Sequence, residues 1–428
     1  MKKNQKEWQE VRLGDISDIN SNILQKSDNY TYINYLDTGN ITKGIIDNIQ
    51  KIPIYDIPSR AKRKVDIGDI IYSTVRPIQK HYGIIKNYID NMIVSTGFIT
   101  IKVKEYIADK YFIYYNIIQD NITNYLQMIA EQSVSTYPSI KPSDLSNMII
   151  KLPPLEEQKK IASILSSLDD KIELNNRMNK ILEEMAQTIF KEWFVNFNFP
   201  NEDGKPYKDS GGKMIESELG AIPDSWEITN LEEICNIYSG YSYSSKDLSS
   251  SSDAMVTIKN FERNGGFKLD GFKEIIISDK VKENHYANLY NVIVAHTDIT
   301  QKADIIGNPI LLLSKGKYNN LIISMDLVKV TLKNNDISNT VLYNILSNIN
   351  FKNHCLSYSS GTTVLHLSKK ALPSYKLAYP NSKLLKKLSN ILEPIYKKIS
   401  IIYEENQKLD SIRDTLLPKL MSGEIRVK

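Results

Sequence analysis

Two distant stretches of the chain read almost alike, and this repeat constrains the fold more than any other feature. Four apolar residues near the N-terminus recur 218 positions later: Trp8, Leu13, Ile16 and Ile19 return as Trp226, Leu231, Ile234 and Ile237. Farther along, four residues recur 227 positions later: Thr136, Ile140, Leu145 and Pro153 return as Thr363, Leu367, Leu372 and Pro380. A repeat of this length is a whole domain used twice. We therefore expect two similar domains, each followed by a long helix.

Composition fits a chain that folds in water. Of the 428 residues, 41% are hydrophobic and 24% are charged, which are ordinary values for a globular protein. The sequence has no apolar run long enough for a membrane span and no apolar core of a signal peptide near Met1, so we expect a cytoplasmic protein without a membrane partner. Cys235 and Cys355 lack counterparts in the first copy, which favours two buried thiols over a disulfide or zinc site.

The periodicity of the apolar residues predicts an α+β fold. Alternation predicts strands at 30–36, 41–50, 69–75 and 92–103, and helical spacing follows over 109–131. The second copy repeats this order with strands at 291–296 and 321–332 and a helix at 339–355. The expected architecture is two similar mixed α/β domains separated by two long helices that pack as an antiparallel coiled coil, with an internal pseudo-two-fold repeat. The predicted boundaries are 1–152 for the first domain, 153–197 for its helix, 198–225 for a Gly- and Pro-bearing connector, 226–379 for the second domain and 380–428 for the last helix.

The two long helices carry a seven-residue apolar repeat. Pro153 and Pro154 precede a helix expected to begin near Leu155, with Glu156 and Glu157 in its first turn. The predicted seam comprises Ile161, Leu165, Leu168, Ile172, Asn175, Asn179, Leu182 and Ile189 in the first helix, and Leu388, Leu392, Ile395, Ile399, Ile402, Asn406, Leu409 and Leu416 in the second. Asn179 and Asn406 correspond in the repeat. A polar residue in such a seam fixes register at a cost in stability.

Basic side chains gather locally although the net charge is only +4. Around the strand predicted at 69–75 lie Arg60, Lys62, Arg63, Lys64, Arg76, Lys80 and His81. Such a cluster is typical of a ridge that binds nucleic acid, but a solvated sheet edge explains the charges equally well. The 26 tyrosines leave a similar choice between base stacking and strand formation.

Several segments resemble one known family. The stretch Leu152-Pro-Pro-Leu-Glu-Glu-Gln158, its continuation over 161–172, and Phe190-Lys-Glu-Trp-Phe194 resemble the central conserved region of the specificity (S) subunit of type I restriction-modification systems. The ending Leu416-Leu-Pro-Lys-Leu-Met-Ser-Gly-Glu-Ile-Arg-Val427 resembles the C-terminal conserved region of that family. The second copy departs from the pattern, because Tyr379-Pro-Asn-Ser-Lys-Leu-Leu385 replaces the first motif.

This resemblance implies a DNA-reading subunit without chemistry of its own. Each domain would be a target-recognition domain that reads one half of a split site in double-stranded DNA. The paired helices would set the spacer and dock two modification (methyltransferase) subunits. Restriction/translocase subunits would complete the complex, which methylates adenine at N6 and defends against phage. No cofactor is expected on this chain, and S-adenosylmethionine, ATP and Mg²⁺ are expected on the partner subunits.

By similarity, two segments resemble the loop-bearing parts of recognition domains: the segment that ends at Pro77 in the first domain, and Val294–Lys302 in the other domain. Arg76 is the strongest candidate for a guanine or phosphate contact, because a guanidinium forms two parallel hydrogen bonds with a guanine edge. Candidate DNA contacts in the second domain are Thr297, Asp298, Thr300, Gln301, Lys302, Ser360, Gly361 and Thr362. A turn or capping role for Asp298, and a plain turn at 359–362, remain open alternatives.

Enzymatic motifs are missing from the sequence. No two glycines stand in a G-x-G pair, and the phosphate-binding G-x-x-x-x-G-K-[ST] loop is absent. The five histidines have neither H-E-x-x-H spacing nor a neighbouring cysteine pair, so no metal site is predicted. The remaining alternatives are a bivalent coiled-coil scaffold that binds proteins, and an enzyme with an unfamiliar site; loops that diverged between the copies count against the enzyme.

Overall fold

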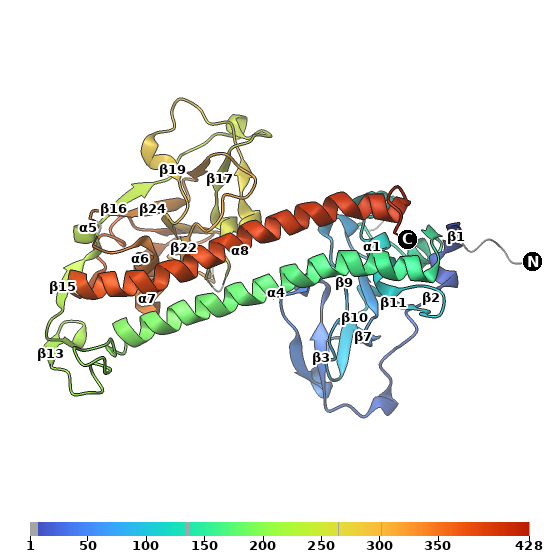
Figure 1. The fold of residues 1–428 in the computed structure, drawn as a ribbon, viewed down its shortest axis with the longest axis horizontal. Helices are drawn as coiled ribbons and strands as arrows, with labels where there is room; N and C mark the ends of the chain where they lie inside the picture. Colours follow the sequence, from blue (N-terminus) through green and yellow to red (C-terminus); the bar gives the residue numbers. More distant parts are fainter. Residues whose placement is uncertain (1–6, 133–136, 264, 301, 335, 428) are drawn as a thin grey trace, which may run out of the picture. The chain divides into compact units, whose positions relative to one another are not determined.

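The computed structural model describes residues 7–132, 137–263, 265–300, 302–334 and 336–427. The chain forms two compact units, the first built from residues 1–172 and 409–428 and the second from residues 173–408. Two long helices, α4 (Leu155–Phe194) and α8 (Ser382–Ser422), each begin in one unit and end in the other as an unbroken coil (Figure 1). The predicted α+β class with an internal repeat is confirmed.

Unit 1 contains two four-stranded sheets. One has the strand order β6-β3-β10-β7, with β3 and β10 parallel, and the other has the order β2-β11-β8-β9. A separate antiparallel pair, β1 with β12, joins the start of the domain to the segment that leads into α4. The strands are β1 Gln9–Arg12, β2 Ser17–Ile19, β3 Tyr32–Leu36, β4 Ile41–Thr42, β5 Ile45–Ile46, β6 Gln50–Pro53, β7 Ala61–Lys64, β8 Ile70–Ser73, β9 Tyr82–Ile84, β10 Met92–Ser95, β11 Phe98–Val103 and β12 Ile149–Leu152.

Unit 2 repeats the two four-stranded sheets, and its pair of β15 with β27 matches that of β1 with β12. Its sheets have the orders β18-β17-β23-β19, again with a central parallel pair, and β16-β24-β20-β22. Taken along the chain, each of these strands has the same partners as its counterpart in unit 1. The strands are β13 Met214–Ser217, β14 Gly220–Pro223, β15 Glu227–Asn230, β16 Cys235–Ser239, β17 Ala254–Val256, β18 Lys273–Glu274, β19 Tyr286–Ala287, β20 Val292–Ala295, β21 Thr297–Asp298, β22 Pro309–Leu311, β23 Leu321–Ile323, β24 Leu327–Leu332, β25 Ser359–Ser360, β26 Leu365–Leu367 and β27 Lys376–Tyr379.

Several predicted elements prove to be double, among them the strand expected over 321–332, which is β23 and β24 in different sheets. The single strand expected over 92–103 is two strands, β10 and β11, which belong to different sheets. The chain changes sheets at Thr96 and Gly97, where the Thr96 amide donates to the Arg60 carbonyl and the Gly97 carbonyl accepts from Thr74. Apolar alternation continues through this change of partner, so the sequence pattern does not reveal it.

The helix expected over 109–131 is likewise two helices, because Gln119 takes an extended backbone conformation (ψ 146°). The helix expected over 339–355 also divides, and the Asn348 side chain caps the second part by accepting from the Asn350 amide. In both cases a second helix follows the break directly, so the helical spacing of apolar residues continues and the sequence does not reveal the break. The shorter helices are α1 Lys110–Ile117, α2 Asp120–Glu131, α3 Pro142–Ser146, α5 Leu231–Ile234, α6 Asn339–Leu346 and α7 Ile349–Ser357.

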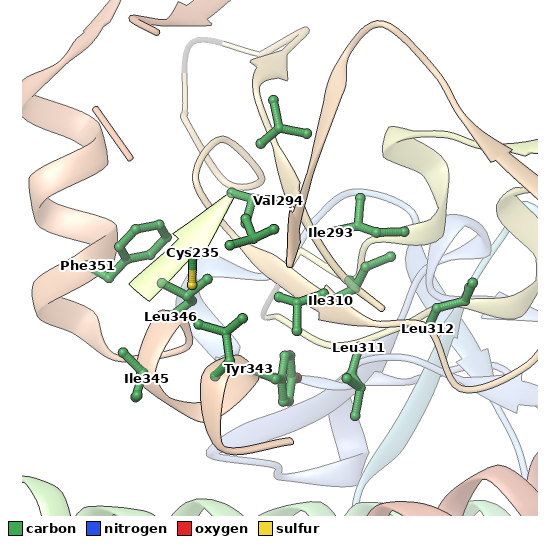
Figure 2. Close-up of a cluster of buried hydrophobic side chains, with 14 of the residues drawn as sticks. Cys235, Ile293, Val294, Ile310, Leu311, Leu312, Tyr343, Ile345, Leu346 and Phe351 are labelled. Carbon is green, nitrogen blue, oxygen red and sulfur yellow. The ribbon is translucent and has the colours of Figure 1, made fainter. Parts of the chain in front are cut away.

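The core of unit 2 lies between its larger sheet and helices α6 and α7. Figure 2 shows Ile293 and Val294 of β20, Ile310 of β22, and Leu346 and Phe351 of the helices in one buried cluster. Cys235 and Cys355 are buried free thiols, as predicted, and burial raises the pKa of each to about 12. A thiol with so high a pKa stays protonated and packs as a small apolar group.

The long helices pack antiparallel within each unit. In unit 1, Arg413 of α8 donates to Asp169 of α4, and Arg426, just beyond the end of α8, donates to Glu157 near the start of α4. In unit 2, Asn175 of α4 donates to Asn406 of α8 over 2.8 Å. Asn179, the repeat counterpart of Asn406, makes no such pair, and its Oδ1 is buried without a hydrogen-bond partner among the described residues. The predicted seam residues are all buried or half-buried in their own units.

The segment 198–225 is more ordered than a plain surface connector. It contains the hairpin of β13 and β14, and its Phe199 and Ile222 are buried. Both side chains belong to a cluster around Trp226, where the Phe199 and Trp226 rings stack with centroids 5.6 Å apart. Among the described residues, no helix has an apolar stretch of the length a bilayer crossing needs.

Candidate nucleic-acid interface

The loop after β8 presents Arg76 on the surface of unit 1. Residues Thr74 to Arg76 are held by main-chain hydrogen bonds to the segment around Ser139: the Ile140 amide donates to Thr74, and the Arg76 amide donates to Pro138. Arg76 is exposed and has a left-handed backbone (φ 46°), which is uncommon for a residue with a Cβ. Its guanidinium lies 5.7 Å from the centre of the Tyr137 ring. The ring restrains the cation by a cation–π contact while leaving it on the surface.

A short 3-10 turn, Pro77–Gln79, follows Arg76 and is braced by α2. The Gln127 side-chain oxygen accepts a hydrogen bond from the Ile78 amide over 3.2 Å. Lys80, which also has a left-handed backbone, forms an ion pair with Asp120 at the start of α2. Two left-handed residues with side chains therefore bracket one rigid turn. Strained positions of this kind are typical of functional loops.

The remaining basic residues predicted in unit 1 occupy two separate settings. Arg60 and Lys62 are exposed beside or on the edge strand β7, whereas Lys64 is paired with Asp28 over 2.6 Å. Arg63 is half-buried; its Nε has no partner among the described residues, and burial lowers its pKa. His81 lies beyond the turn, with Nδ1 2.6 Å from the Ile41 carbonyl. The most accessible cations of the predicted cluster are therefore Arg60, Lys62 and Arg76.

Unit 2 builds its counterpart of this site from two segments far apart in sequence. After β20 the chain forms β21, in which Thr297 pairs with His366 of β26, and β25 adds Ser360 on the other side of β26. The same relation in unit 1 is the bridge between Val75 and Ser139. The fold thus brings together both groups of predicted contacts, 297–302 and 360–362, except that Gln301 lies outside the described residues.

Two of the predicted contacts in unit 2 do not face solvent. Asp298 is fully buried, and its carboxylate accepts from the Thr300 amide and hydroxyl and from the amides of Ile305 and Ile306. Burial raises the pKa of Asp298, but these hydrogen bonds outweigh it and leave the pKa below its ordinary value. Thr297 is only 6% exposed. This burial does not favour contacts of these two side chains with base edges, and the hydrogen bonds of Asp298 fit the turn-forming role that was the alternative.

The other predicted contacts around β21, β25 and β26 are accessible, and they are polar or basic. Lys302, Ser360, Gly361 and Thr362 are exposed there, and Thr300 is half-buried. A Cβ at Gly361 would lie 2.0 Å from the Val364 carbonyl oxygen, so only glycine allows this turn. Ile299, His366 and, in unit 1, Tyr137 are exposed at the same places and were missed by the sequence analysis. No local pattern marks them, because long-range strand pairing places them at the site.

Each site offers hydrogen-bond donors and positive charge on a rigid loop. Such groups suit contacts with phosphates and base edges. Across the described residues, no three His, Cys, Asp or Glu side chains gather in the manner of metal ligands.

Comparison with known proteins identifies the family. Residues 5–184 and 223–411 match the family model described as "Type I restriction modification DNA specificity domain". The chain is 28% identical to the type I restriction enzyme HindI specificity subunit of Haemophilus influenzae, over 98% of this chain and all of that protein. It is also 28% identical to the MjaIX specificity subunit of Methanocaldococcus jannaschii, over 84% of this chain and 78% of that one.

Solved structures show a similar fold. The S subunit of a type I restriction-modification system from M. genitalium aligns over 98% of both chains with a TM-score of 0.55 and 17% identity. The two matched segments of the family model cover most of the sequence and coincide with the two copies of the internal repeat. This chain therefore belongs to the type I restriction-modification DNA specificity family.

Proposed function

We propose that this chain is the DNA specificity subunit of a type I restriction-modification complex, and that each unit reads one half of a split site in double-stranded DNA. The observation that carries the proposal is that one topology, used twice, presents different side chains at the same place. Unit 1 presents Arg76 on the Tyr137 ring, whereas unit 2 presents Lys302 and the turn at 360–362. A shared scaffold with different surface groups is what two unlike half-sites require.

The chain itself performs no chemistry in this proposal. Methyl transfer to adenine N6 belongs to two modification subunits that bring S-adenosylmethionine, and ATP-driven translocation and cutting belong to restriction subunits that bring ATP and Mg²⁺. The family match favours this assignment over a scaffold that binds only proteins. The direct test is methylation of a plasmid library by this chain and its modification subunit. A split motif is expected; methylation without a motif would refute DNA reading.

An exposed apolar stripe on α4 supports the proposed docking of a modification subunit. Leu174, Met178, Ile181 and Met185 are 48%, 37%, 56% and 49% exposed. Their spacing of four, three and four residues places them on one face of the helix, at about 100° per residue. An exposed row of this kind is what a partner helix covers in a coiled coil. We assign this face to a helix of the modification subunit.

The corresponding positions on α8 differ in chemistry. Positions 227 residues after the four stripe residues hold Ile401, Glu405, Lys408 and Ile412, so two of the four apolar residues become charged while the two isoleucines are exposed. The second modification subunit would therefore dock on a more polar face. A less apolar contact buries less hydrophobic surface and holds its partner less tightly.

Charge on the α4 stripe should weaken this docking. We expect the double variant Met178→Glu, Ile181→Lys to bind fewer modification subunits per chain in native mass spectrometry. Lys180→Glu is the matched control, because it changes a charge on the same helix about 130° away from the stripe. If the double variant binds as many modification subunits per chain as the unaltered chain at low subunit concentration, this face is not the docking site.

A further inference from the structure

The ammonium group of Lys352 is enclosed by one loop of unit 2. Lys352 lies on α7, and its Nζ donates to the main-chain carbonyls of Ala303, Asp304 and Ile306 at 2.9, 3.3 and 2.6 Å. Three carbonyl acceptors use the full donor capacity of a lysine ammonium. The partial burial that accompanies this arrangement lowers the pKa of Lys352. Removing an ammonium group from water is costly, and the three carbonyl hydrogen bonds offset that cost here.

Asp298 binds the amide groups of the same loop. Its buried carboxylate accepts from the amides of Thr300, Ile305 and Ile306 at 2.8, 2.7 and 3.2 Å. The carbonyls of residues 303, 304 and 306 thus point at a cation, while the amides of 305 and 306 point at an anion. The described residues of the loop 299–306 are therefore held through their main chain by the half-buried ammonium of Lys352 and the buried carboxylate of Asp298.

The loop needs this external support because its own conformation is unfavourable. Ala303 has a left-handed backbone (φ 54°), which an alanine seldom adopts. Gly307, where the loop returns to the sheet, also has positive φ, and a Cβ there would lie 2.6 Å from Cys355 Cβ of α7. The loop therefore sits directly on α7, and it directs Ile299, which is 65% exposed, and Lys302 to the surface.

We infer that Lys352 and Asp298 are positioning residues for DNA recognition, which set the conformation of the loop 299–306 and so determine what unit 2 reads. This inference rests on the proposed function. Unit 1 uses a different support. Lys352 is the fourth residue of α7, the fourth residue of the equivalent helix α2 is the buried Thr123, and Gln127 and Asp120 of α2 brace the turn instead. Loss of Lys352 should therefore change one half-site alone.

The first test measures the loop without DNA. Lys352→Met and Asp298→Asn each remove one charge with little change in shape, and Lys370→Met is the control because Lys370 is exposed on the same unit. Hydrogen exchange of peptides covering 299–306 should become about ten-fold faster in both variants, with β20 unchanged. Unchanged exchange in the loop would overturn the inference that the pair holds it.

The second test measures recognition. With the modification subunit present, Lys352→Met should relax the methylated motif at one or more positions of one half-site and leave the other half-site intact. Lys352→Arg, which keeps the positive charge, should give the original motif. An unchanged motif, or equal loss at both half-sites, would contradict a positioning role. Failure of the unaltered chain to give any motif would instead refute the proposed function, while the exchange experiment would still decide whether the pair holds the loop.

Discussion

Asn175 donates a hydrogen bond to Asn406 over 2.8 Å inside the apolar seam between α4 and α8 in unit 2. Both residues are buried, and the contact is extended by Glu405, which also accepts from Asn175, and by Asn176, which accepts from Asn406. A buried amide pair is satisfied in only one alignment of the two helices. The pair therefore fixes the register of α4 against α8, which apolar contacts alone specify less strictly.

We expect this pair to show strong coupling. Asn406→Leu leaves the polar partners of Asn406 without their bond and should cost about 1–3 kcal/mol of unfolding free energy. The double variant Asn175→Leu, Asn406→Leu should be less destabilised than the sum of its single variants, because two apolar residues then face each other. Denaturant unfolding of the four proteins of the cycle measures this; strictly additive losses would show that the contact has no role in register.

Asn179 provides a contrasting prediction. It occupies the same place in the repeat as Asn406, yet its Oδ1 is buried without a hydrogen-bond partner among the described residues. Asn179→Leu should therefore stabilise unit 2, by roughly 1 kcal/mol or more, since an unsatisfied buried polar group costs about 1–3 kcal/mol. Loss of stability in this variant would mean that the amide is satisfied in solution.

The ion pair between Arg426 and Glu157 predicts a pH dependence of unit 1. Two hydrogen bonds of 2.7 and 2.9 Å from Arg426 hold the pKa of Glu157 below its ordinary value of 4.5. A carboxyl whose folded pKa is depressed contributes stability above its unfolded pKa, and this contribution is lost as the pH falls through the folded pKa. Arg426→Gln should therefore lower Tm at pH 7 and differ less from the unaltered chain below about pH 4.

Thermal scans from pH 7 to pH 3 measure this difference, with Lys419→Gln as a control for loss of one exposed charge. Lys419 lies 3.8 Å from Glu424, a distant and exposed pair. The control should show little change at any pH. A constant difference between Arg426→Gln and the unaltered chain across the whole range would contradict the assigned role of Glu157.

Arg76→Ala should alter one half-site. The guanidinium is exposed on a braced turn, and a bidentate contact with guanine contributes about 1–3 kcal/mol of discrimination. We expect a loss of roughly 5- to 150-fold at one half-site in methylation assays on variant oligonucleotides. Lys151→Ala, an exposed lysine on β12, is the control. Equal loss at both half-sites would contradict a local reading role.

Lengthening both long helices should lengthen the spacer between half-sites. Seven residues added after Ile172 in α4 and seven before Leu409 in α8 preserve the heptad pattern and add on the order of 10 Å. At 3.4 Å per base pair this corresponds to about three base pairs. The motif in methylated DNA measures the spacer, and the same insertion at the exposed turn Glu202–Gly204 is the control. An unchanged spacer in the helix variant would refute the hypothesis that the length of the paired helices sets the spacer.

The repeated architecture could be predicted because the internal repeat and the seven-residue apolar spacing can be read directly from the sequence. Trp8 and Trp226 marked the two copies, and seven-residue columns marked the helices over 155–194 and 382–422. The sequence did not predict the break between β10 and β11, where the chain changes sheets without changing its apolar alternation. Such a change depends on which strand lies alongside, which no local pattern records.

The candidate site was predicted only in part, for a related reason. Arg76 is exposed on a loop, as expected for a basic residue after a buried strand. The burial of Asp298 could not be predicted, because a polar residue in a loop has the same sequence signature whether its partner is water, DNA or its own main chain. Lys352 was missed because 46 to 49 residues separate it from the carbonyls that it binds. Burial of a charge is a property of the tertiary fold.

We propose that each unit reads its own half of a split DNA site. The most direct test is genome-wide mapping of adenine methylation in cells that express this chain with its modification subunit, before and after the first domain is replaced by that of another family member. We expect a split motif in which only one half changes after the exchange. A motif that changes in both halves, or no motif at all with a modification subunit of proven activity, would contradict it.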